Sequence, residues 1–171
     1  MVAEFNLDNW PMAYVKFTNC EMTDEIFDEY KRNYLNMLIR CKNNKEKIIL
    51  ICDLDHTQNM PLNYLMKQTQ FNKEVEKFNK EYVRCVCIMC KNKGFKNMLN
   101  LYFSVSKPAS PFKIFRSTEK ANKYINDKFN IKFDINKLYD KKDTDEDLQE
   151  EEEEEKNEQS GESQNEDKKL Y

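Results

Sequence analysis

The chain has 171 residues, with 28 Lys and Arg, 31 Asp and Glu, and a formal net charge of −3. That length allows one domain with a single core plus an appendage. No apolar run reaches the length of a membrane span and no charged-then-apolar leader opens the chain. We therefore expect no transmembrane segment and no secretion, which predicts a cytoplasmic protein. Glycine occurs only at Gly94 and Gly161, which excludes a glycine-rich phosphate-binding loop.

The charge is divided between two parts of the chain. Residues 1–139 carry 23 Lys and Arg and 16 Asp and Glu, a net charge of +7, whereas residues 140–171 carry 5 and 15, a net charge of −10. The second part contains six consecutive glutamates, residues 150–155, and its apolar side chains are too few to offset the entropy of ordering it. The sequence predicts an α/β domain over 1–139 and a disordered Glu-rich acidic tail over 140–171.

The first half of the domain contains recognisable strand and helix signals. Residues 4–7 are typical of an edge strand, and residues 12–17 of a strand with aromatic and β-branched side chains. Thr23 is a good N-cap for a helix whose apolar residues recur at helical spacing up to residues 43–44. Residues 48–52, directly after Lys47, then form an apolar run without polar alternation, which indicates a strand buried on both faces.

The second half continues the alternation of helices and strands. We expect a single helix from about Pro61 to about Tyr82, with Leu62 among its core-facing residues. A strand over 84–90, a helix after Gly94, a turn between two prolines, a strand over 112–115 and a helix capped by Ser117 follow. Helical connections between consecutive strands imply a mostly parallel sheet covered by helices.

The six cysteines sit mostly in apolar runs, which indicates reduced, buried thiols. Cys85, Cys87 and Cys90 are close enough in sequence to raise the alternative of a zinc site. Alternation along a strand places Cys85 and Cys87 on one face and Cys90 on the other, and structural zinc sites usually draw their cysteine pairs from turns. The sequence therefore predicts buried packing and no metal.

The stretch Asp53-Leu54-Asp55-His56-Thr57 follows the buried strand and resembles the D-x-D-x-T signature of haloacid-dehalogenase-type phosphohydrolases. The resemblance implies that Asp53 attacks phosphorus, that Asp55 is general acid and base, and that Mg²⁺ bridges them. That family also needs a Ser or Thr after its second strand and an acidic pair after its fourth. Here the strand over 84–90 is followed by a lysine, and residues 116–118 contain no carboxylate. The phosphohydrolase is therefore the alternative hypothesis, and the leading hypothesis includes no catalytic residue and no cofactor.

Two further stretches, residues 82–89 and 111–121, resemble the SpoIIAA-like superfamily, which contains STAS domains and the CRAL-TRIO lipid-binding fold. The shared pattern is a cysteine-rich strand, an amphipathic helix, a turn with proline, a short aromatic strand and a Ser-x-Glu-x-Ala helix start at Ser117. The resemblance covers roughly residues 3–130 and implies a SpoIIAA-like α/β sandwich. STAS switch proteins carry a phosphorylatable serine after the central strand, whereas residues 56–61 contain no serine. Thr57 is a weak substitute, so we expect no phosphorylation.

The residues and the resemblance together lead to one function hypothesis. The protein is predicted to be a non-enzymatic regulatory or interaction module of the STAS/CRAL-TRIO-like type that binds an unknown protein partner. An anionic lipid headgroup is a further candidate ligand, because Lys91, Lys93 and Lys96 surround a helix start with free backbone N–H groups. The alternative is that these lysines are ordinary solvated residues. No nucleic acid is expected, because no aromatic-basic interleaving accompanies the positive charge.

Overall fold

The computed structural model describes residues 2–18, 22–57 and 61–138. The predicted tail at 140–171 and Cys20 lie outside the described residues. Residues 2–133 belong to one compact unit, and a short 3₁₀ helix, η1 (Ile135–Leu138), belongs to a second unit.

The first unit is built on a five-stranded sheet whose spatial order equals its order in the chain. The strands are β1 (Val2–Asn6), β2 (Met12–Thr18), β3 (Ile48–Asp53), β4 (Val83–Met89) and β5 (Phe112–Phe115). β1 pairs antiparallel with β2, and the other three pairings are parallel. The predicted α/β class, the mostly parallel sheet and the N-terminal edge strand are thus confirmed.

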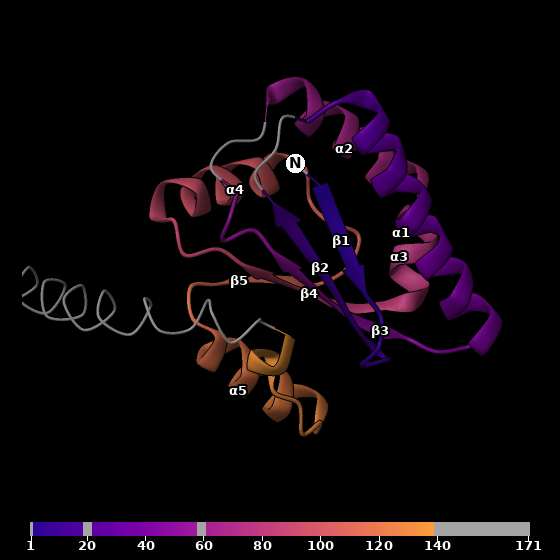
Figure 1. The fold of residues 1–171 in the computed structure, drawn as a ribbon, viewed down its shortest axis with the longest axis vertical. Coiled ribbons are helices and arrows are strands. Elements are labelled where there is room, and N and C mark those ends of the chain that lie inside the picture. Colours follow the sequence, from indigo (N-terminus) through magenta and orange to yellow (C-terminus); the bar gives the residue numbers. More distant parts are fainter. Residues whose placement is uncertain (1, 19–21, 58–60, 139–171) are drawn as a thin grey trace, which may run out of the picture. The chain divides into compact units, whose positions relative to one another are not determined.

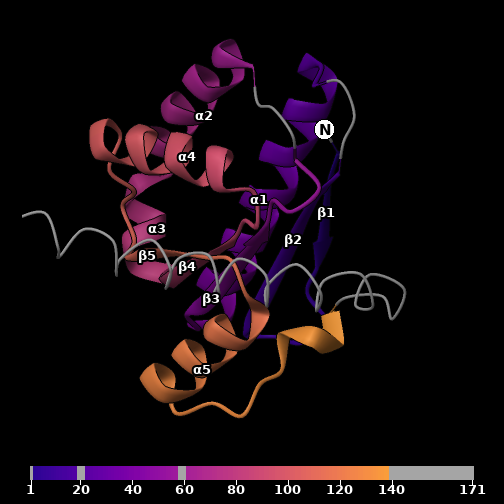
Figure 2. The ribbon, with the colours of Figure 1, turned by 90° about the vertical axis from the view of Figure 1, so that its left-hand side faces the viewer.

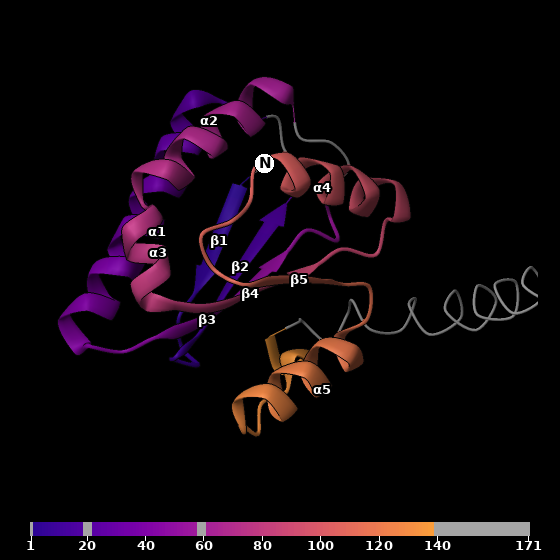
Figure 3. The ribbon, with the colours of Figure 1, turned by 180° about the vertical axis from the view of Figure 1, so that it is seen from behind.

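Helices cover both faces of this sheet, but unequally (Figure 1, Figure 3). The helices α1 (Asp24–Asn44), α2 (Leu62–Glu74), α3 (Glu76–Tyr82) and α4 (Lys93–Val105) lie on one face, and α5 (Thr118–Phe129) lies on the other. Right-handed crossovers that always move to the next strand in the same direction leave their helices on the same face. α5 follows the last strand and is free of that constraint. We call the face under α1 to α4 the helix-layer face.

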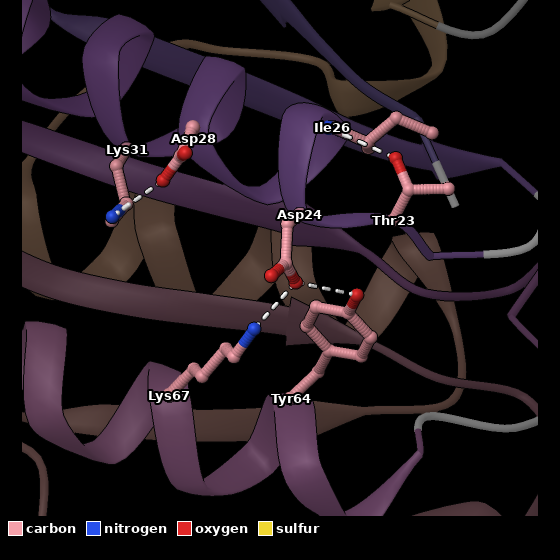
Figure 4. A network of polar contacts seen from close by, with 7 residues as sticks. All are labelled: Thr23, Asp24, Ile26, Asp28, Lys31, Tyr64 and Lys67. Atoms are coloured by element: carbon pink, nitrogen blue, oxygen red, sulfur yellow. Dashed lines mark hydrogen bonds and ion pairs between the residues drawn. The ribbon is translucent and has the colours of Figure 1, made fainter.

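Local signals set several helix ends as the sequence predicts. The Thr23 and Ser117 hydroxyls accept hydrogen bonds from the backbone N–H groups of Ile26 and Lys120 and so cap α1 and α5. Asp24, in the first turn of α1, also holds α2: it accepts a hydrogen bond from the Tyr64 hydroxyl at 2.9 Å and pairs with Lys67 (Figure 4). The hydrogen bond from Lys67 and that from Tyr64 place the pKa of Asp24 below its ordinary value.

The single helix expected from Pro61 to Tyr82 is wrong, because the chain forms α2 and α3 with a bend at Val75. Val75 has φ −97° and ψ 8° and is buried. The bend brings Asn79 onto α1, where its side-chain oxygen accepts a hydrogen bond from the Tyr34 hydroxyl at 3.0 Å. Tertiary packing against α1 therefore overrides the continuous helical pattern.

Strand alternation divides the core between the two faces. Ile48 and Leu50 belong to the cluster under the helix layer, so Ile49, Ile51 and Asp53 point to the opposite face. The same alternation places Cys90 among the α4 contacts, whereas Cys85 lies 3.8 Å from the Tyr124 hydroxyl of α5. The predicted separation of Cys85 and Cys87 from Cys90 is confirmed. The five described cysteines are unpaired thiols, and four of them are buried.

Candidate functional site

The carboxylate of Asp53 is completely buried at the C-terminal end of β3. Its Oδ2 accepts a hydrogen bond from the Tyr14 hydroxyl of β2 at 2.6 Å, and its Oδ1 accepts one from the backbone N–H of Asp55 at 2.9 Å. The loop after the strand closes with a bond from the Thr57 N–H to the Leu54 carbonyl at 2.9 Å. Asp53 therefore fixes the neighbouring strand and its own loop at once.

Asp55 makes the corresponding link toward β4. Its Oδ1 accepts a hydrogen bond from the backbone N–H of Lys91 at 2.8 Å. Its Oδ2 is buried without a hydrogen-bond partner, and the Lys91 ammonium lies 3.9 Å away, within ion-pair distance. Burial, followed by the nearby charge of Asp53, raises the pKa of Asp55 to about 6. The folded structure therefore disfavours the ionised form of Asp55 relative to its protonated form.

A third link reaches β5. The Arg116 side chain donates from Nε to the Lys91 carbonyl oxygen at 3.3 Å. Tyr14, Asp53, Asp55, Lys91 and Arg116 together link the body of β2 to the C-terminal ends of β3, β4 and β5, and we call these five residues the strand-end chain. Ligands of α/β proteins usually bind at this edge, but here these polar groups are largely engaged with one another.

The strand-end chain bears directly on the phosphohydrolase alternative. The structure brings Asp53 and Asp55 together, as the D-x-D-x-T stretch predicts. However, a nucleophilic carboxylate must reach its substrate, and Asp53 is 0% exposed with both oxygens accepting hydrogen bonds. The chain leaving β4 passes directly from Cys90 to Lys91, and β5 is followed by Arg116. Among the described residues, no three His, Cys, Asp or Glu side chains are grouped to hold a metal ion.

Thr57 and His56 complete the loop as far as it is described. Thr57 is 2% exposed, and its hydroxyl oxygen is buried without a hydrogen-bond partner. The expectation that Thr57 is not phosphorylated stays a prediction. His56 is exposed, and residues 58–60 lie outside the described part of the chain.

The three candidate lysines have different environments. Lys91 belongs to the strand-end chain, Lys93 is exposed at the first residue of α4, and Lys96 is half-buried in its first turn. Asn92 already caps this helix, because its side-chain oxygen accepts a hydrogen bond from the Phe95 N–H at 2.9 Å. The anion site at these lysines stays a prediction.

The sequence patterns did not predict four exposed apolar side chains on two helices of the helix layer. Leu62 and Met66 of α2 are 73% and 67% exposed, and Leu101 and Val105 of α4 are 70% and 85% exposed. The assignment of Leu62 to the core is therefore wrong. α2 and α4 lie side by side (Figure 2), joined by a hydrogen bond between Thr69 and Tyr102 at 2.7 Å. We call Leu62, Met66, Leu101 and Val105 the outer apolar surface. The spacing of four residues in each pair is its sequence signal.

Within the described residues, every helix is too short or too polar to cross a membrane.

Comparisons with known proteins add no family assignment. No protein-family model, no curated protein and no solved structure matches this chain.

Proposed function

We propose that the protein is a non-enzymatic interaction module of the STAS/CRAL-TRIO-like type, and that it binds a protein partner through the outer apolar surface. The order of elements from β4 to α5 supports the SpoIIAA-like part of this proposal. An amphipathic helix, a turn between Pro108 and Pro111, a short aromatic strand and a helix capped by Ser117 follow one another as in the resemblance.

The outer apolar surface is the observation that carries the proposal. Scattered exposed apolar residues are ordinary on protein surfaces, but a contiguous group marks an interaction site. Here two residues one turn apart on α2 and two one turn apart on α4 are each at least two-thirds exposed, and the two helices are joined by a side-chain hydrogen bond. A partner that covers these side chains removes apolar area from water, and each Å² that is buried contributes about 25 cal/mol to the free energy of binding.

A paired substitution tests this surface. Met66→Glu combined with Val105→Glu places charge on both helices without touching buried residues. Asn63→Glu combined with Asn100→Glu is the matched control, because both asparagines are exposed on the same two helices. Affinity capture followed by mass spectrometry should recover a partner with the wild type and the control and lose it with the first variant. Equal recovery with all three proteins would contradict the proposal.

The phosphohydrolase alternative makes a separate forecast. Purified protein with Mg²⁺ would cleave a generic aryl phosphate, and Asp53→Asn would abolish the turnover. We expect no turnover above a buffer blank, because the Asp53 carboxylate is buried and both its oxygens are engaged. Turnover that depends on Mg²⁺ and on Asp53 would replace the interaction hypothesis.

The anionic lipid headgroup is tested by liposome flotation. Lys93→Gln combined with Lys96→Gln removes two of the candidate cations and leaves Lys91, which contacts Asp55. Binding to anionic vesicles should occur at low salt, weaken in the variant, and weaken as salt shortens the screening length toward about 10 Å at 0.1 M. If the protein does not float with the vesicles at low salt, the lipid headgroup is excluded as a ligand and only the protein partner remains.

A further inference from the structure

A cavity of about 150 Å³ lies between the helix-layer face of the sheet and the helices above it. Parallel strands in the middle of a sheet are normally covered completely on both faces. Here Cys52 of β3 and Val86 of β4 point toward the helix layer, yet both remain partly exposed. The helix layer therefore leaves a space over the middle strands, and this cavity occupies it.

The walls of the cavity are mostly apolar, and they are uncharged. Tyr30 and Tyr34 come from α1, Leu65 and Gln68 from α2, and Tyr102 from α4, and none of the described residues that line it is charged. Burial raises the pKa of Cys52 to about 12, and it also raises the pKa of Tyr30 and of Tyr34. These groups remain neutral at physiological pH, so a charged ligand would lose its hydration without gaining an opposite charge.

The cavity also contains hydrogen-bonding groups with spare capacity. The Gln68 amide donates to the Tyr30 hydroxyl at 3.4 Å and to the Asn72 side-chain oxygen at 2.9 Å. Within the described part of the chain, no acceptor takes the Tyr30 hydroxyl proton or the Asn72 amide protons. By contrast, Tyr102 donates to Thr69, whose own proton goes to the Leu65 carbonyl. Tyr30 and Asn72 can therefore donate to a ligand that carries an acceptor oxygen.

The volume and the aromatic lining limit the ligand further. An apolar cavity of about 150 Å³ is large enough for a benzene ring. Six of the lining side chains are aromatic: Phe17, Tyr30, Tyr34, Tyr102, Phe103 and Phe112. Aromatic side chains favour a second ring at their edges or offset from their faces.

We propose that this cavity binds one compact, uncharged aromatic molecule that carries a hydrogen-bond-accepting oxygen, of the aryl ketone or phenol class. The site goes beyond the proposed function, because it faces the sheet and does not include the outer apolar surface. Either site can exist without the other.

Four probe molecules separate the features of this proposal. Acetophenone has the ring and the acceptor, ethylbenzene has the ring alone, benzoate adds a negative charge, and 1-octanol replaces the ring with an alkyl chain. Titrations of the full chain, followed by ¹H–¹⁵N NMR, should show acetophenone shifting the amides of α1, α2 and β3 around the cavity. Ethylbenzene should bind about 3- to 10-fold more weakly, the factor of one net hydrogen bond. Benzoate should bind at least about 100-fold more weakly because its charge is desolvated.

Variants connect the binding to named groups. Tyr30→Phe should weaken the binding of acetophenone and leave the binding of ethylbenzene unchanged, and Tyr30→Phe combined with Asn72→Leu should reduce acetophenone to the affinity of ethylbenzene. Tyr124→Phe is the matched control, because it removes a tyrosine hydroxyl on the opposite face of the sheet. Ala109→Leu fills part of the cavity from a half-buried loop position and should abolish binding of both probes while the NMR spectrum stays dispersed.

Several results would overturn the proposal. Benzoate binding as tightly as acetophenone would show that the cavity is not selective for neutral ligands. Tighter binding of 1-octanol than of either aromatic probe would make it an alkyl-chain site. Equal effects on acetophenone and ethylbenzene, both for Tyr30→Phe and for its combination with Asn72→Leu, would show that the cavity forms no hydrogen bond with the ligand. The absence of any shift with any probe would show that the cavity binds no such ligand.

Discussion

Replacing Asp55 with asparagine should make the protein more stable at neutral pH. The carboxylate pKa is raised from 3.8 to about 6 by burial and by the charge of Asp53. Because folding raises this pKa, the stabilising contribution of the protonated form is fully present below about pH 4 and is lost as pH rises through about 6. A rise of roughly two units in this pKa lowers the free energy of unfolding by about 3 kcal/mol between pH 4 and a pH well above 6. Asparagine keeps an oxygen that can accept the Lys91 N–H and cannot ionise.

Above pH 7 we therefore expect Asp55→Asn to unfold at a free energy about 1–3 kcal/mol higher than the wild type, allowing for the lost attraction to Lys91. A gain of about 2 kcal/mol corresponds to about 4–8 °C in melting temperature for a chain of this length. Urea denaturation followed by circular dichroism, at pH values from 4 to 8, measures the difference. Asp127→Asn, at an exposed position of α5, is the control. Parallel pH curves for wild type and Asp55→Asn, or a variant less stable at pH 8, would refute the reasoning.

Asp53→Ala removes the acceptor of two hydrogen bonds from partly or fully buried donors, so the free energy of unfolding should fall by about 2–4 kcal/mol. A loss below about 0.5 kcal/mol in urea denaturation would show that the strand-end chain contributes little to stability. Deleting residues 140–171 removes a net charge of −10 from a chain whose other part carries +7. The deletion should strengthen binding to heparin at low salt, and the gain in affinity should shrink as the salt concentration rises. Equal affinities for full-length and truncated protein at low salt would identify the tail as a solubilising appendage.

Features encoded by neighbouring residues could be predicted from the sequence. The N-caps Thr23 and Ser117 act on N–H groups three residues away, and the strand over 112–115 has the predicted bounds. The buried character of β3 follows from its unbroken apolar run. These signals need no knowledge of the tertiary structure, which explains why the predictions agree with the structure there.

Features that depend on distant segments could not be predicted in this way. Tyr14 and Asp53 are 39 positions apart in the chain, and their contact requires the pairing of β2 with β3. The bend at Val75 depends on the position of α1. Leu62 has the spacing of a core residue, but helical periodicity does not show which side of a helix meets its neighbours. The cavity depends on the distance between layers, which no local pattern encodes.

The coincidence of strand order and chain order has a consequence for synthesis. A chain emerges from the ribosome at about 5–20 residues per second and folds from its N-terminus. Each strand pairs with the one made just before it. Every new strand therefore adds to the existing edge of the sheet, and none has to insert between two strands that are already in place. Until β5 emerges, that edge is the apolar strand β4, and unpaired apolar edges recruit other chains. β5 has only four residues and is the shortest strand of the sheet. Once β5 has paired with β4, the exposed edge on this side therefore has few backbone groups with which another chain could pair.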